Sequence, residues 1–102
     1  MRENIEKLLM DAGITPNLMG FDYLIDAIEM INESSIKPQM SEIYLSLGEK
    51  YQIEWKCVER CIRTAINKMD LEFWNKIGGR SNKLKNAEVI FTLALFVKRG
   101  NR

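Results

Sequence analysis

The chain has 102 residues, enough for one domain with a small core. Hydrophobic residues make up 46% and charged residues 28%, which is typical of a globular chain and excludes a disordered one. Histidine is absent, and two cysteines are too few for a disulfide framework or a four-ligand zinc site. The sequence has no apolar run of membrane-spanning length and no signal-peptide core at its start, so we expect a cytoplasmic protein.

The net charge of +1 conceals a strong asymmetry between the two halves of the chain. Residues 1–49 carry three basic and nine acidic side chains, a net charge of −6, whereas residues 50–102 carry twelve basic and five acidic ones, a net charge of +7. This asymmetry is typical of a protein whose basic part binds a polyanion. The alternative is a solvated charge distribution without a partner.

Apolar residues recur every three or four positions in the first third of the chain, which predicts two amphipathic helices. The first covers residues 2–12 and ends at Gly13, a residue type that commonly follows a helix. Thr15 and Pro16 form a start signal for the second, which ends within residues 32–35. Four acids are expected on the solvated face of this second helix: Asp22, Asp26, Glu29 and Glu33.

Four more helices are predicted, over about residues 39–50, 54–69, 71–77 and 87–98. Asp70 and Asn86 are expected to cap the last two of them, and the loop over residues 80–85 is basic. The final helix is apolar nearly all round, which is typical of a core helix or of half of an interface. Because no strand pattern occurs, the sequence predicts an all-α, compact six-helix bundle that forms one domain over residues 1–102.

The third and fourth predicted helices have the pattern of a helix-turn-helix. This motif needs a small residue where the two backbones approach, and Gly48 supplies it. It also needs apolar residues on the inner faces, and these positions hold Leu47, Tyr51, Ile53, Val58, Cys61 and Ile62. The pattern therefore predicts that the helix over residues 54–69 enters the major groove of DNA.

The outward positions of that helix carry side chains suited to reading DNA. Arg60 and Arg63 share one face, and the guanidinium fork matches guanine O6 and N7. Glu59 can accept from a cytosine amine or hold an arginine in place. We expect these three to read bases. Contacts to the DNA backbone or the groove edge are expected from Trp55, Lys56, Arg80, Lys83 and Lys85. The alternative is an ordinary amphipathic helix with mixed charges outside.

Several stretches resemble the C-terminal DNA-binding domain of the sporulation-initiation response regulator family of endospore-forming bacteria. They occur in order along nearly the whole chain, at residues 12–14, 20–28, 58–66 and 86–90. The resemblance implies a six-helix domain whose fourth helix enters the major groove, with Glu59, Arg60 and Arg63 at base-reading positions. The family's hydroxyl-rich helix start is replaced by residues 53–56, and its receiver domain is missing, so we expect a divergent stand-alone relative.

Other functions find little support in the sequence. Cys57 and Cys61 lie four residues apart, but two thiolates do not hold zinc. Ser34, Ser35 and Ser81 have no histidine to activate them. We therefore expect neither an enzyme nor a cofactor, a metal site or a small-molecule substrate.

We expect a sequence-specific double-stranded DNA-binding protein, a transcription regulator that acts as a homodimer or a tandem pair, because one small module touches only a few base pairs. A plasmid or phage accessory protein that marks a DNA site would use the same contacts. The alternative from another class is a helical protein-interaction module, which would dock through the acidic half or the last helix.

Overall fold

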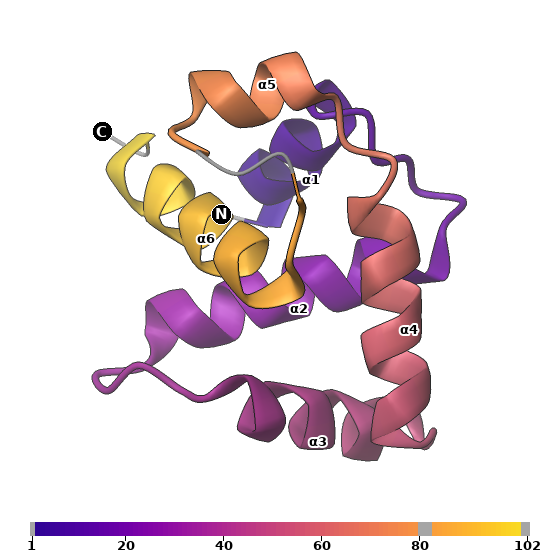
Figure 1. The fold of residues 1–102 in the computed structure, drawn as a ribbon. Helices are drawn as coiled ribbons and strands as arrows, with labels where there is room; N and C mark the ends of the chain where they lie inside the picture. Colours follow the sequence, from indigo (N-terminus) through magenta and orange to yellow (C-terminus); the bar gives the residue numbers. More distant parts are fainter. Residues whose placement is uncertain (1, 80–82, 101–102) are drawn as a thin grey trace.

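The computed structural model describes residues 2–79 and 83–100, and within these it contains six α-helices and no strand (Figure 1). The helices in chain order are α1 (Arg2–Asp11), α2 (Met19–Glu33), α3 (Met40–Tyr51), α4 (Trp55–Ile66), α5 (Leu71–Lys76) and α6 (Asn86–Gly100). The radius of gyration is 12.5 Å, as expected for a compact domain of this length. The predicted all-α, six-helix fold is confirmed.

Helix α2 lies at the centre and packs against α1, α3, α4 and α6. Its inner face holds Leu24, Ile25 and Ile28, which are fully buried. Gly20 lies where α2 crosses α4, and a methyl group there would overlap the carbonyl oxygen of Cys61 and come within 2.8 Å of the Ala65 Cβ. The absence of a side chain at Gly20 therefore allows the two backbones to approach.

Several helix ends differ from the prediction. Helix α2 begins at Met19 because the segment from Thr15 to Leu18 forms a turn in which the Leu18 N–H donates to the Thr15 carbonyl. Helix α4 ends at Ile66, three residues earlier than predicted. The Asp70 cap is confirmed, since its carboxylate accepts from the backbone N–H of Glu72 at 3.2 Å.

The prediction that Asn86 caps the last helix is wrong. It is the first residue of α6, and its side-chain amide donates to groups on α3 and α4. The buried face of α6 holds Val89, Ile90 and Leu93, so this helix belongs to the core. Leu95 and Phe96 on the same helix remain exposed.

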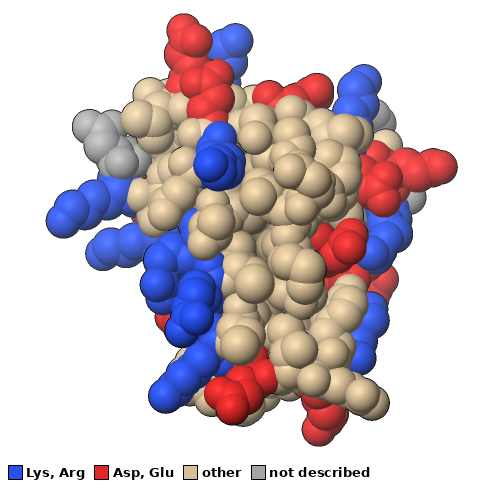
Figure 2. Space-filling view, turned by 90° about the vertical axis from the view of Figure 1, so that its right-hand side faces the viewer, with Lys and Arg blue, Asp and Glu red and all other residues tan. Residues whose placement is uncertain are grey.

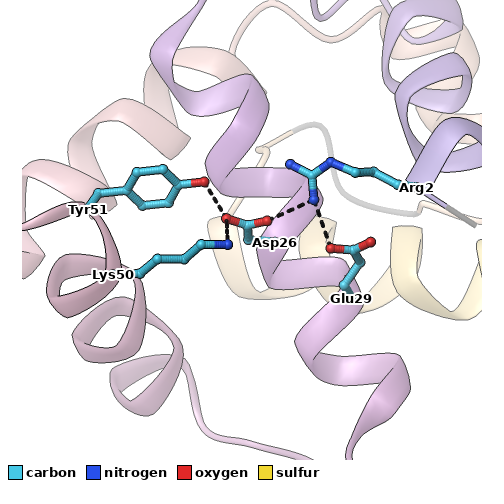
Figure 3. A network of polar contacts seen from close by, with 5 residues as sticks. All are labelled: Arg2, Asp26, Glu29, Lys50 and Tyr51. Atoms are coloured by element: carbon cyan, nitrogen blue, oxygen red, sulfur yellow. Dashed lines mark hydrogen bonds and ion pairs between the residues drawn. The ribbon is translucent and has the colours of Figure 1, made fainter.

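Asp26 is buried, which makes the prediction that it lies on a solvated face wrong. Its carboxylate accepts from Arg2 Nη1 at 3.1 Å, from Lys50 Nζ at 3.0 Å and from the Tyr51 hydroxyl (Figure 3). Arg2 Nη1 also lies 3.0 Å from Glu29 Oε1. One buried charge on α2 thereby joins the start of α1 to the end of α3.

The ionisation of this cluster follows from its contacts. Burial would raise the pKa of Asp26, but hydrogen bonds from Tyr51, Lys50 and Arg2 outweigh it and hold the pKa below its ordinary value. Burial and the hydrogen bond to Asp26 raise the pKa of Tyr51 to about 12. Asp26 is therefore an anion, and Tyr51 a neutral donor, at neutral pH. Among the other acids predicted on this face, Asp22 and Glu33 are exposed as predicted, whereas Glu29 is half-buried.

Candidate nucleic-acid interface

Helices α3 and α4 are joined by a tight turn over residues 52–54 and cross at a wide angle (Figure 1). Gln52 adopts the left-handed conformation with φ 56°, a role that glycine usually takes after a helix. The Ile53 N–H donates to the Gly48 carbonyl at 2.9 Å, and a Cβ on Gly48 would lie 2.8 Å from the Ile53 carbonyl oxygen. The predicted close approach at Gly48 is confirmed.

The inner faces of α3 and α4 carry the predicted apolar residues. Leu47, Val58 and Ile62 are buried, whereas Tyr51, Ile53 and Cys61 are half-buried. The Tyr51 ring also packs on Tyr23 of α2, with 4.8 Å between the ring centroids. Together with the α2–α4 crossing, these contacts fix the orientation of α4 and leave its opposite face to solvent.

The outer face of α4 presents the predicted base-reading residues. Arg60 and Arg63 are exposed, and 54% of the Arg63 side chain is accessible. Glu59 is half-buried, and its Oε2 lies 3.4 Å from Arg63 Nη2. This ion pair is the arrangement in which a carboxylate holds an arginine in place, one of the two roles considered for Glu59.

The start of α4 is less suited to a phosphate. Glu54 precedes the helix in extended conformation, and its side chain makes no capping hydrogen bond. Glu49 and Glu54 flank a groove of about 510 Å³ that also includes Leu45 and Trp55. Trp55 is 42% exposed, and Lys56 Nζ lies 5.8 Å from its ring centroid. Carboxylates beside the helix start disfavour a close approach by DNA there, despite the partial positive charge of a helix N-terminus.

The basic segment before α6 lies beside the end of α4. Lys83 and Lys85 are exposed, whereas Arg80 lies outside the described residues. A groove of about 550 Å³ runs between this basic segment and the stretch of chain that follows α4, and it is lined by Asn67, Met69, Leu71, Lys83, Leu84 and Lys85. Two lysines far from α4 in the sequence are thus brought next to its carboxyl-terminal end.

Figure 2 shows the face on the α4 side of the molecule. Lysine and arginine side chains gather along the left of this face, and the acidic side chains lie mainly around its periphery. Uncharged surface occupies much of the centre. The charge asymmetry of the sequence therefore becomes a local concentration of basic groups on this face.

The described residues contain no group of three or more cysteine, aspartate or glutamate side chains placed to hold a metal ion. Cys57 is exposed and Cys61 half-buried. Within residues 2–79 and 83–100, the helices are too short or too polar to cross a membrane.

The chain is similar to a known protein family. The family described as sporulation initiation factor Spo0A C terminal matches residues 5–97, which include α2 to α5 completely and most of α1 and α6. No curated protein and no solved structure matches the chain.

Proposed function

Because the chain belongs to the Spo0A C-terminal family, the DNA-binding domains of sporulation regulators, we propose that it is a transcription regulator that reads a specific duplex sequence with α4. Family membership establishes DNA binding in general. It is in keeping with a protein that is not an enzyme. The DNA-reading helix and the individual contacts are inferred from the arrangement of side chains.

The observation that carries the proposal is the outer face of α4. The inner face of α4 packs against α2 and α3, so Arg60 and Arg63 point away from the core on a rigid support. In a helix-turn-helix the second helix enters the major groove, and α3 and α4 have the matching short turn and glycine contact. We infer that Arg60 and Arg63 read guanine edges and that Glu59 orients Arg63 or accepts from a cytosine amine.

The contacts to the DNA backbone follow from the surrounding charges. Lys83 and Lys85 flank the carboxyl-terminal end of α4, where they can neutralise DNA phosphates beside the major groove. Lys56 and Trp55 reach the groove edge from the first turn of α4. Because Glu54 adjoins that turn, we infer that the middle and end of α4 approach DNA most closely. Arg80 belongs to the same basic loop by sequence.

A single module of this size contacts few base pairs, so useful specificity requires two copies on repeated half-sites. We therefore propose that the protein occupies DNA as a homodimer or a tandem pair. The spacing of the half-sites, once known, would identify the symmetry that relates the two copies.

The proposal is tested by selecting duplexes from a random library and measuring affinity by mobility shift. We expect binding to random duplex at low salt, and tighter binding to a selected sequence, by at least about 1000-fold at physiological salt. Binding of equal strength to all duplexes would contradict base reading. No binding to any duplex would contradict the proposal outright and favour an interaction module, with Leu95 and Phe96 on α6 as its exposed apolar side chains.

A further inference from the structure

Asn86 joins three helices at the edge of the proposed DNA interface. It is half-buried at the start of α6, and its Nδ2 donates to the Tyr44 hydroxyl of α3 at 3.0 Å. The same Nδ2 lies 3.3 Å from the backbone carbonyl oxygen of Glu59 on α4. An amide nitrogen carries two N–H groups, so it can serve both acceptors at once.

Both acceptors are well placed to hold the amide. Tyr44 is buried, and burial raises the pKa of its hydroxyl, so the group stays neutral at physiological pH. The Glu59 carbonyl has two lone pairs and can accept from Asn86 in addition to its helical partner. The contact reaches α4 through its backbone at a proposed base-reading position, and therefore constrains the helix itself rather than one mobile side chain.

The basic segment that contains Lys83 and Lys85 leads directly into Asn86. Lys85 immediately precedes Asn86, and the Lys85 carbonyl accepts from the Val89 N–H at 3.0 Å, which forms the first turn of α6. The position of Lys85 is thus set by the start of α6, and the start of α6 is tied to α4 by Asn86.

We propose that Asn86 is a positioning residue for DNA recognition, which holds Lys83 and Lys85 in fixed register with α4. Phosphate contact by the lysines then occurs only when α4 lies at the correct depth and angle in the groove. This inference rests on the proposed function, since it assigns Asn86 a role in the same interface. Its consequence is that sequence discrimination, and not only fold stability, depends on this amide.

The test compares Asn86→Ala with Asn32→Ala. The control removes a similar bond, because Asn32 Nδ2 donates to the Ala94 carbonyl at 3.1 Å between α2 and α6, outside the α3–α4 unit. Affinity is measured for the selected duplex and for random duplex over a range of salt concentrations, at a temperature where circular dichroism shows both variants folded. A third variant, Tyr44→Phe, removes one acceptor and retains the ring.

We expect Asn86→Ala to weaken binding to the selected duplex about 5–30-fold. This is the effect of losing one or two contacts between lysine and phosphate of roughly 1 kcal/mol each. The preference over random duplex should fall, and the log–log salt slope should decrease by about 1–2 units as the lysines lose their register. Tyr44→Phe should give a smaller change in the same direction. Asn32→Ala should lower the melting temperature without changing affinity, preference or slope.

Equal affinity, preference and salt slope in folded Asn86→Ala and wild type would overturn the proposal and leave Asn86 a structural role only. If Asn86→Ala does not fold, Tyr44→Phe decides: an unchanged preference and slope would likewise overturn the inference. Failure of the proposed function gives a different result, since the wild-type protein itself would then show no preference for any duplex.

Discussion

Replacing the buried Asp26 by asparagine should destabilise the domain without altering its DNA preference. The substitution keeps the size of the side chain but removes the charge that receives Arg2, Lys50 and Tyr51. These three donors come from α1 and α3, so the cluster contributes to the packing of both helices on α2. None of the four residues lies on the outer face of α4, and the proposed base contacts should therefore persist.

The expected magnitude follows from the exposure of the partners. A hydrogen bond to a charged group contributes about 1.5–3 kcal/mol when buried. The Arg2 and Lys50 side chains are 44% and 58% exposed, so water replaces Asp26 readily and each ion pair contributes at most about 1 kcal/mol. The Tyr51 bond weakens but survives with a neutral amide oxygen. We expect a total loss of about 1–3 kcal/mol in the free energy of unfolding.

The assay is urea unfolding followed by circular dichroism at several pH values. Because the pKa of Asp26 is lower in the folded protein than in the unfolded chain, its stabilisation is complete above about pH 4 and decreases as the pH falls through the folded value. The difference between wild type and Asp26→Asn should therefore be largest near neutral pH and shrink below about pH 4.

Asp22→Asn is the matched control, since Asp22 is an exposed acid on the same helix. Its effect on the free energy of unfolding should stay within about 0.5 kcal/mol. Two results would refute the reasoning: an Asp26→Asn variant as stable as wild type at pH 7, or a loss of the same size at pH 3 and pH 7. The first would mean that the contacts add no net stability, and the second that the charge is not their source.

Three further predictions concern the basic segment, the helix crossing and the acidic face. Replacing Lys83 and Lys85 by alanine should weaken binding to all duplexes about equally and lower the log–log salt slope by about 1 unit per contact, and an unchanged slope would contradict phosphate contact. Gly20→Ala should lower the free energy of unfolding by about 1–3 kcal/mol or more, because the methyl group meets the backbone of α4, and a variant that unfolds at the wild-type urea concentration would contradict this packing. Asp22→Lys with Glu33→Lys should modestly raise affinity for random duplex through the long-range field, without changing preference. A change of molecular mass in light scattering, with no gain in DNA affinity, would instead identify this face as a partner contact.

The fold could be predicted from the sequence largely because its signals are local. Apolar periodicity predicted the first two helices, and start and cap residues such as Asp70 helped to predict later ones. The glycine at position 48 with the apolar residues around it indicated the α3–α4 contact. The outward-facing positions of α4 were predicted as those that remained once the inward-facing positions of the motif had been assigned. Helix ends were predicted less accurately, because a start signal can also open a separate turn: Pro16 lies in the turn from Thr15 to Leu18, and α2 begins only at Met19.

The errors at Asp26 and Asn86 have a common physical cause. Asp26 repeats at the helical spacing of the exposed acids around it, and the donors that bury it come from residues 24 or more positions away. Asn86 has the sequence context of a helix cap, but its acceptors lie 42 and 27 positions earlier in the chain. A polar side chain whose partners are distant carries no local signature, so only the assembled fold reveals its role.

The most direct test of α4 as the base-reading helix is to repeat the library selection with Arg60→Ala and Arg63→Ala. Each variant should bind the wild-type site about 5–150-fold more weakly, equivalent to roughly 1–3 kcal/mol, and should lose preference at one base position, different for the two variants. Lys68→Ala, which removes an exposed positive charge just beyond α4, should select the wild-type sequence. Recovery of the unchanged wild-type site at full affinity by both arginine variants would contradict the assignment of α4 as the reader.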